Sequence, residues 1–189
     1  MTSQKEMSEA EKILLQIEKL SEKHFLPIVG PAKGEVLAEE VRKAMPKRVV
    51  EVGTLIGYSA VLIGRELDAD AELVSMEVHA DEAELAKQNI KRAGLPVKVS
   101  VLVGDAKNVI PTLDGMFDFA FIDAEKDEYF EYLKLLEDKL RVGAVVVADN
   151  AGIFADQMRD YLDYVRSSGR FRSHFVRVGG DGLEISVKL

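Results

Sequence analysis

Acidic and amide side chains follow two apolar segments of the chain. Asp123 ends the run FDFAFID, and Asp149 and Asn150 end the run VGAVVVADN. A buried carboxylate without a partner costs several kcal/mol, so we expect these groups to meet solvent, a cation or a ligand. Two carboxylates and one amide oxygen form an oxygen-only set that suits Mg²⁺, or another divalent cation such as Mn²⁺ or Ca²⁺. Taken alone, Asp149 and Asn150 could instead open a turn or cap a helix.

Lys126 lies three residues after Asp123, at the expected start of a helix. A cation is unfavourable at a helix N-terminus because the positive end of the helix dipole lies there, which indicates another role for this lysine. A divalent cation nearby would favour the neutral amine, so Lys126 could serve as the general base for a hydroxyl proton. Without a metal, the alternative is a solvated lysine beside Asp127 and Glu128.

A glycine-containing loop could hold a second ligand. In VVEVGTLIGYSA, Gly53 and Gly57 enclose a loop that lets the backbone approach a ligand and exposes amides to a negative group. The loop is neither the G-x-G-x-x-G dinucleotide fingerprint nor a phosphate-binding loop with Gly-Lys-Ser/Thr. The alternative interpretation is a tight turn between a strand and a helix.

Two further acids could complete a nucleoside site. Glu77 ends the next apolar run, where an acid can accept both hydroxyls of a ribose, although a solvated carboxylate is the alternative. With the glycine loop, Glu77 favours a nucleoside ligand without a pyrophosphate, such as S-adenosylmethionine. Asp105 would then lie near the adenine amine, or it could cap the following helix.

These residues require a scaffold that brings the ends of apolar segments together. From Lys47 onward, apolar runs alternate with amphipathic segments; the runs are RVVEVG, AELVSMEV, VKVSVLVG, FDFAFID and VGAVVVADN. Continuous hydrophobicity is typical of parallel strands covered on both faces by helices, so the pattern predicts a doubly wound α/β domain. Ligands bind at the carboxyl ends of such strands. The segment FADQMRDYLDYVRSSG predicts a further helix, and GGDG between FRSHFVRV and GLEISVKL predicts a terminal antiparallel hairpin.

The N-terminal part predicts two amphipathic helices. SEAEKILLQIEKLSEK contains Ser8 and Glu11 as a capping box, and KGEVLAEEVRKAM ends at Pro46. We expect residues 1–45 to cover the cofactor and substrate side of a core formed by residues 46–189, giving a single domain over 1–189. The apolar stripe of the first helix could also form a homodimer contact.

Composition limits the partners of the protein. The 189 residues are 47% hydrophobic and 31% charged, and a net charge of −8 disfavours an extended phosphate-backbone interface without excluding a small RNA. The absence of cysteine excludes thiolate metal ligands and cysteine nucleophiles. No apolar run suits a secretion signal or a membrane span, so we expect a cytoplasmic protein without membrane contact.

In order and spacing, five segments resemble the cation-dependent, S-adenosylmethionine-dependent O-methyltransferases, the family of the catechol and caffeoyl-CoA enzymes. They are VGPAKGEVL, VVEVGTLIGYSAVLIGREL, SMEVHADEAELAKQNIKRAGL, FDFAFIDAEKDEYFEYL and VGAVVVADN, and the resemblance runs from about Val29 to Glu184. It implies an α/β fold, the class I methyltransferase Rossmann-like fold, with a seven-stranded, mostly parallel sheet, an antiparallel last strand and helices on both faces.

The resemblance also implies roles for individual residues. Lys126 matches the catalytic lysine, and the metal ligands match Asp123, Asp149 and Asn150. The cofactor-binding positions are expected at Val29, Glu51, Gly53, Gly57, Ser59, Glu77, Asp105 and Asp123. The chain departs from the animal catechol enzymes at Ala124-Glu125, where they have His-Trp, and at Ala106-Lys107, where they have Ser-Gln. Its final hairpin is also shorter, which leaves the methyl acceptor open.

The expected reaction is therefore methyl transfer from S-adenosylmethionine to one hydroxyl of a catechol-like aromatic diol, with Mg²⁺ bound to both oxygens. One alternative acceptor is a hydroxylated uridine in tRNA, for which the candidate basic patch is Arg166, Arg170, Arg172 and Arg177, although such a cluster is often a solvated surface. A noncatalytic cofactor-binding module ranks lower, because such a module has no chemical need to keep Lys126 and the metal ligands.

Overall fold

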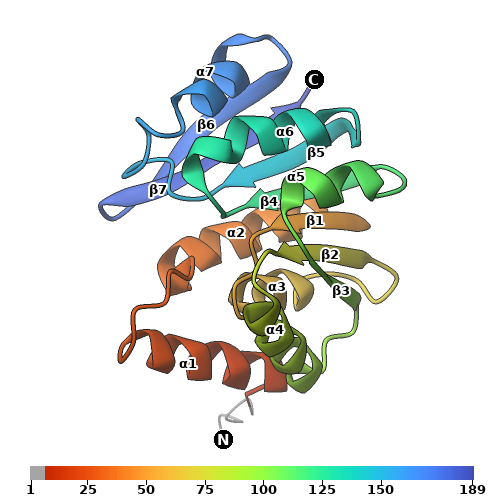
Figure 1. Ribbon diagram of the computed structural model, residues 1–189, viewed down its shortest axis with the longest axis vertical. Coiled ribbons are helices and arrows are strands. Elements are labelled where there is room, and N and C mark those ends of the chain that lie inside the picture. Colours follow the sequence, from red (N-terminus) through yellow and green to blue (C-terminus); the bar gives the residue numbers. More distant parts are fainter. Residues whose placement is uncertain (1–6) are drawn as a thin grey trace, which may run out of the picture.

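A computed structural model describes residues 7–189 and contains one seven-stranded sheet (Figure 1). Residues 1–6 of the expected N-terminal part lie outside the described range. The strands are β1 (Arg48–Val52), β2 (Glu72–Glu77), β3 (Lys98–Val103), β4 (Phe117–Ile122), β5 (Leu140–Ala148), β6 (Phe171–Val178) and β7 (Asp181–Lys188). The helices are α1 (Glu9–Ser21), α2 (Gly30–Ala44), α3 (Tyr58–Gly64), α4 (Ala80–Ala93), α5 (Ala106–Val109), α6 (Tyr129–Glu137) and α7 (Arg159–Ser167), with short 3-10 turns η1 (Ile110–Thr112) and η2 (Lys126–Glu128).

The sheet has the strand order β3-β2-β1-β4-β5-β7-β6. The pairs among β1 to β5 are parallel, whereas β7 is antiparallel to both β5 and β6. The predicted fold, including the terminal hairpin and the antiparallel last strand, is confirmed. The order reverses between β1 and β4, and this switch point is where open α/β sheets bind ligands.

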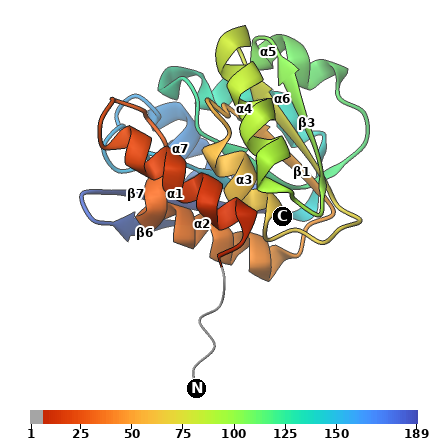
Figure 2. The same ribbon diagram turned by 90° about the horizontal axis from the view of Figure 1, so that it is seen from below.

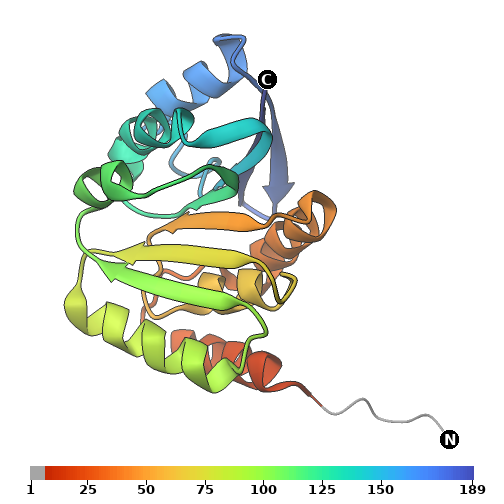
Figure 3. The ribbon, with the colours of Figure 1, turned by 90° about the vertical axis from the view of Figure 1, so that its right-hand side faces the viewer.

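Alternating residues of the central strands supply two separate hydrophobic cores. One core contains Val49, Phe119, Phe121 and Val147; the other contains Val50, Ala120, Ile122 and Val146. Helix α2 belongs to the first core and α6 to the second, and Figure 3 shows them on opposite sides of the sheet. Both faces are covered, which explains why the strands are apolar throughout rather than alternating.

The first helix folds back onto its own chain. Ser8 and Glu11 form the predicted capping box, and the apolar stripe of α1 is buried in the first core. Helix α1 packs against α3 and α4, as Figure 2 shows, and the Tyr58 hydroxyl donates a hydrogen bond of 2.6 Å to Glu18. The apolar stripe of α1 therefore packs against other helices of the same chain.

One predicted helix is shorter than expected. The sequence FADQMRDYLDYVRSSG forms helix only from Arg159, and the residues between Asn150 and Met158 form consecutive turns. Asn150 has a left-handed φ of 61°, and the amides of Gly152 and Ile153 donate to the Asp181 carboxylate instead of starting a helix. Among residues 7–189, no helix has the length and hydrophobicity needed to cross a membrane.

Candidate active site

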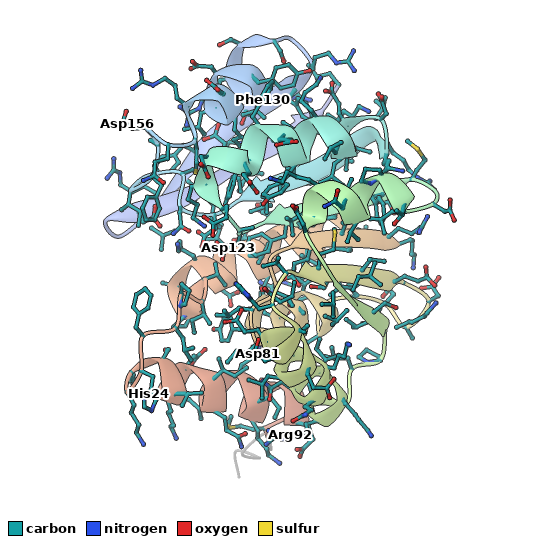
Figure 4. All side chains as sticks on the ribbon, in the orientation of Figure 1. His24, Asp81, Arg92, Asp123, Phe130 and Asp156 are labelled. Carbon is teal, nitrogen blue, oxygen red and sulfur yellow. The ribbon has the colours of Figure 1, made fainter. Side chains whose placement is uncertain are left out.

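The carboxyl ends of four parallel strands lie side by side at the switch point. In register, Val52 is opposite both Met76 and Ile122, and Ile122 is opposite Ala148. The amide of Asp123 donates to the Val52 carbonyl (2.9 Å), and that of Asp149 donates to the Ile122 carbonyl (3.0 Å). The glycine loop and the predicted cation ligands therefore share one edge of the sheet, and Figure 4 shows Asp123 near the middle of the molecule.

The two loop glycines are required by the backbone. Gly53 has a φ of +87°, and a Cβ there would lie 2.2 Å from the carbonyl oxygen of Asp123. Gly57 has a φ of +88°, and a Cβ there would lie 3.1 Å from the Cα of Ala86. Both positions favour glycine because other residues rarely adopt these angles; a Cβ would also clash at Gly53 and would be tightly packed at Gly57. A tight turn is thus present, and it brings the loop backbone against Asp123 at the end of β4.

Glu77 is held by this loop rather than solvated. Its carboxylate is buried and accepts the amide of Leu55 at 2.8 Å and the amide of His79 at 3.0 Å. Leu55 has a φ of +52°, an unusual angle for a residue other than glycine. Each carboxylate oxygen can accept a second hydrogen bond, so Glu77 is oriented yet able to bind a diol such as a ribose.

Glu51 lies beneath the loop and is fully buried. One carboxylate oxygen accepts the hydroxyl of Ser75, whereas Oε1 and the nearby Thr54 hydroxyl have no hydrogen-bond partner among the described residues. Burial raises the pKa of Glu51 to about 7, although serine hydroxyls oppose the shift. Buried polar atoms without a hydrogen-bond partner destabilise the folded protein. A polar ligand bound on the loop could supply hydrogen bonds to these atoms.

Lys126 folds back from η2 onto the end of β4. Its ammonium donates to Asp123 Oδ1 at 2.9 Å, to the Ala124 carbonyl at 2.8 Å and to the Tyr129 hydroxyl at 3.0 Å. Its side chain is only 16% exposed. The interpretation as a solvated lysine is therefore wrong, and the amine is fixed beside a predicted cation ligand.

Asp149 is a buried carboxylate with a cationic partner. Lys33, from the first turns of α2, places its ammonium 2.6 Å from Asp149 Oδ1. Burial raises the pKa of Asp149 to about 7, the charge of Asp123 adds to this effect, and Lys33 opposes it. Asp123 and Asp149 follow adjacent parallel strands, so a cation bound at these strand ends would stabilise both carboxylates.

Lys33 and Asp181 are site residues that the sequence analysis missed. Asp181 Oδ2 accepts from Lys33 at 2.7 Å and from Asn150 Nδ2 at 3.0 Å, while Oδ1 accepts the amides of Gly152 and Ile153. Burial raises the pKa of Asp181, but Lys33 and these other donors outweigh it and lower the value to about 2. In the sequence, GGDG predicts only a turn at Asp181, and the segment VGPAKGEVL indicates no individual role for Lys33.

The remaining predicted positions have different environments. Val29 is the buried residue preceding α2, and Ser59 is buried in the first turn of α3. The Asp105 carboxylate accepts the Lys107 amide at 2.8 Å, so it does cap the following helix. In the candidate basic patch, Arg166 is paired with buried Glu184 and Arg170 with buried Glu137. Two of the four arginines are therefore already neutralised within the chain.

The donor set fits a hard divalent cation. Asp123, Asp149 and Asn150 offer oxygen ligands at adjacent strand ends, and no thiolate ligand competes, because the chain has no cysteine. The ammonium groups of Lys33 and Lys126 contact these carboxylates, which shows that positive charge is favourable at this place. The residues present could therefore hold Mg²⁺, Mn²⁺ or Ca²⁺.

Comparison with known proteins identifies the family of the chain. A profile of the O-methyltransferase family matches residues 4–164. The catechol O-methyltransferase of Mus musculus is 39% identical over 181 residues, covering 88% of this chain and 67% of the mouse protein. Catechol O-methyltransferase B of Danio rerio is 37% identical over 174 residues, covering 85% of this chain and 65% of that protein. The chain thus spans about two thirds of the length of these relatives.

A solved structure extends the similarity to the whole fold. The O-methyltransferase TomG from Streptomyces achromogenes, which is involved in tomaymycin synthesis and was crystallised in complex with S-adenosylmethionine, superimposes with a TM-score of 0.85. The two chains are 26% identical, and the match covers 97% of this chain and 91% of TomG. With the family profile and the sequence relatives, this similarity shows that the chain belongs to the O-methyltransferase family.

Proposed function

We propose that this protein transfers a methyl group from S-adenosylmethionine to one hydroxyl of a catechol-like aromatic diol, with the help of a divalent cation. The observation that carries the proposal is the convergence of Lys126 with Asp123, Asp149 and Asn150 beside the glycine loop. The catechol O-methyltransferase relatives support the acceptor class, and the S-adenosylmethionine complex of TomG supports the cofactor.

The glycine loop and Glu77 would bind the nucleoside part of the cofactor. The loop backbone lies between two glycines with positive φ angles, and the Glu77 carboxylate is already fixed by two backbone amides. Fixing the carboxylate before binding reduces the entropy lost when a ribose hydroxyl pair binds. The backbone carbonyl of Asp123 lies close to Gly53, so a cofactor bound at the loop would lie next to the predicted cation ligands.

Asp123, Asp149 and Asn150 would hold the cation at the other half of the site. When bound, S-adenosylmethionine supplies the methyl group, and the cation favours the ionised form of the acceptor hydroxyl. Lys126 is fixed beside Asp123 and would accept the hydroxyl proton in its neutral form. An acceptor with two adjacent hydroxyls fits this site, because two neighbouring oxygens can share one hard cation.

Charge favours a small acceptor over tRNA. The chain has a net charge of −8, and Arg166 and Arg170 of the candidate basic patch are engaged by buried glutamates. A phosphate backbone would have to compete with these pairs.

The test is methyl transfer from labelled S-adenosylmethionine to a panel of catechols, including a caffeoyl compound, with Mg²⁺ and with EDTA. We expect turnover that EDTA abolishes and that Lys126→Ala lowers by about 10²-fold or more, the usual contribution of a general base. Turnover that persists in EDTA would contradict the cation dependence. If no catechol is methylated although the protein binds S-adenosylmethionine, the acceptor proposal is wrong, and methylation of tRNA is the next assay.

A further inference from the structure

We propose that Asp181 is a positioning residue that orients the side-chain amide of Asn150, so that the oxygen of this amide is available to the cation. The inference rests on the proposed cation dependence but concerns a residue outside the expected ligand set. Asp181 begins β7, distant in sequence from Asn150, and β7 is the antiparallel neighbour of β5. Figure 1 shows β5 and β7 side by side.

A side-chain amide has two chemically different ends. Only the oxygen of Asn150 can bind a cation, because the NH₂ group is a donor without an acceptor site. Asn150 Nδ2 donates to Asp181 Oδ2 at 3.0 Å. An ionised carboxylate accepts hydrogen bonds and cannot donate them, so it selects the NH₂ end and leaves Oδ1 directed elsewhere.

The Asp181 carboxylate is held in place by several hydrogen bonds, so it can orient the side-chain amide of Asn150. Its Oδ1 accepts the Gly152 amide at 3.1 Å and the Ile153 amide at 3.0 Å. Its Oδ2 accepts the Lys33 ammonium at 2.7 Å in addition to the Asn150 amide. The four donors fix both oxygens of the carboxylate.

Lys33 connects Asp181 to Asp149, the neighbouring proposed cation ligand. Its ammonium lies 2.6 Å from Asp149 Oδ1 and 2.7 Å from Asp181 Oδ2, and its side chain is mostly buried. The lysine therefore offsets the repulsion between the two carboxylates and fixes the spacing between the ends of β5 and β7. The backbone amide of Asn150 also donates to Asp149 Oδ1, at 2.7 Å. Asp149, Asn150 and Asp181 thus form one connected network.

The experiment measures Mn²⁺ binding directly, by the electron paramagnetic resonance signal of free Mn²⁺, without acceptor or turnover. Asp181→Asn keeps the size of the side chain but sets an NH₂ group opposite donors. We expect Mn²⁺ affinity to fall about 10- to 100-fold, the usual cost of losing a partner of a metal ligand. The affinity for S-adenosylhomocysteine should change less than about 2-fold, because the glycine loop is untouched. Activity should return when Mn²⁺ is raised.

Two comparisons make the result specific. The matched control is Asp156→Asn, an exposed residue in the same connection whose carboxylate pairs with Arg159, and it should leave Mn²⁺ affinity unchanged. Combining Asp181→Asn with Asn150→Asp exchanges the amide and the carboxylate while keeping their total charge. The exchanged pair can again form one hydrogen bond and present one oxygen, so it should recover most of the lost affinity.

The outcomes separate this inference from the proposed function. If the wild-type protein binds no Mn²⁺, the cation dependence itself is wrong. If it binds Mn²⁺ and Asp181→Asn binds equally well, Asp181 does not position Asn150. If Asp181→Asn does not fold, the double variant Asn150→Asp with Asp181→Asn provides the test. A Mn²⁺ affinity near that of the wild type supports the inference. A Mn²⁺ affinity lower by 10-fold or more, about 1.4 kcal/mol, overturns it.

Discussion

The two halves of the candidate site contain a buried carboxylate of similar pKa in very different surroundings. Glu51, under the glycine loop, has hydroxyl neighbours and one oxygen without a partner, and its pKa is raised to about 7. Asp149, at the end of β5, is also raised to about 7, but it contacts the Lys33 ammonium. In the proposed cofactor half, backbone amides hold the Glu77 carboxylate, whereas in the proposed cation half, lysine ammonium groups pair with the aspartates.

This difference assigns separate tasks to the halves. Backbone amides and positive φ angles fix a shape, which suits a large ligand that must be bound in one orientation. Charged side chains set the local electrostatic potential, which suits the binding of a small ion. Gly53 links the two, since its Cα faces the backbone carbonyl of Asp123. Changes that affect only one half should therefore separate cofactor binding from cation binding.

The largest effect is expected where the halves touch. Gly53→Ala would place a Cβ 2.2 Å from the Asp123 carbonyl oxygen, at a φ of +87°. Overpacking against backbone and the strained angle together should cost about 3 kcal/mol or more in unfolding free energy and abolish cofactor binding. Urea unfolding and calorimetry with S-adenosylhomocysteine measure the two effects.

Gly94→Ala is the matched control. Gly94 also has a positive φ, +61°, but a Cβ there meets nothing within 4 Å. Gly94→Ala should lower the unfolding free energy by only about 1 kcal/mol, because alanine is less favourable than glycine at a left-handed φ, and it should leave cofactor affinity unchanged. Equal losses for the two variants would show that the contact with Asp123 does not matter.

A smaller effect is expected from the uncompensated carboxylate of Glu51. Its folded-state pKa of about 7 lies above the ordinary value of 4.5, so the folded protein binds the extra proton and stability falls as pH rises between these values. Between pH 5 and pH 8 this group should lower the unfolding free energy by about 2–3 kcal/mol. Glu51→Gln should remove this slope in urea unfolding, and an unchanged slope would assign it to other groups.

The smallest effect is expected for the orientation of Glu77. Glu77→Gln replaces one acceptor oxygen by a donor that faces the Leu55 or His79 amide. Affinity for S-adenosylhomocysteine should fall about 10-fold, while Mn²⁺ affinity stays constant. Glu72→Gln, at the exposed opposite end of the same strand, is the control. A parallel loss of Mn²⁺ affinity would mean that the halves are not separate.

The fold followed from local patterns in the sequence. Apolar runs such as FDFAFID predict strands covered on both faces, and the capping box at Ser8 predicts the start of α1, because both signals depend on neighbouring residues. The start of α7 did not follow, since the turns after Asn150 are held by Asp181 from another strand. A contact between residues so distant in sequence has no local signal.

The same distinction applies to the site. Gly53 and Asp123 could be identified because they stand at strand ends within recognisable segments, and the structure brings them together. Lys33 and Asp181 were missed because their roles depend on contacts across the fold: Lys33 contacts both Asp149 and Asp181, and Asp181 also contacts Asn150. The sequence allows two roles for Asp105, and the hydrogen bond from the Lys107 amide shows that it caps the following helix.

The most direct test of separate halves is Asp149→Asn, with cofactor binding and turnover measured on the same preparation. The variant keeps the size of the side chain but replaces the carboxylate of a proposed cation ligand, directly after β5, by an amide. We expect S-adenosylhomocysteine affinity within about 3-fold of the wild type and Mg²⁺-dependent methyl transfer to a catechol lowered by about 10²-fold or more. Unchanged methyl transfer, or loss of both properties together, would contradict the proposed division of the site.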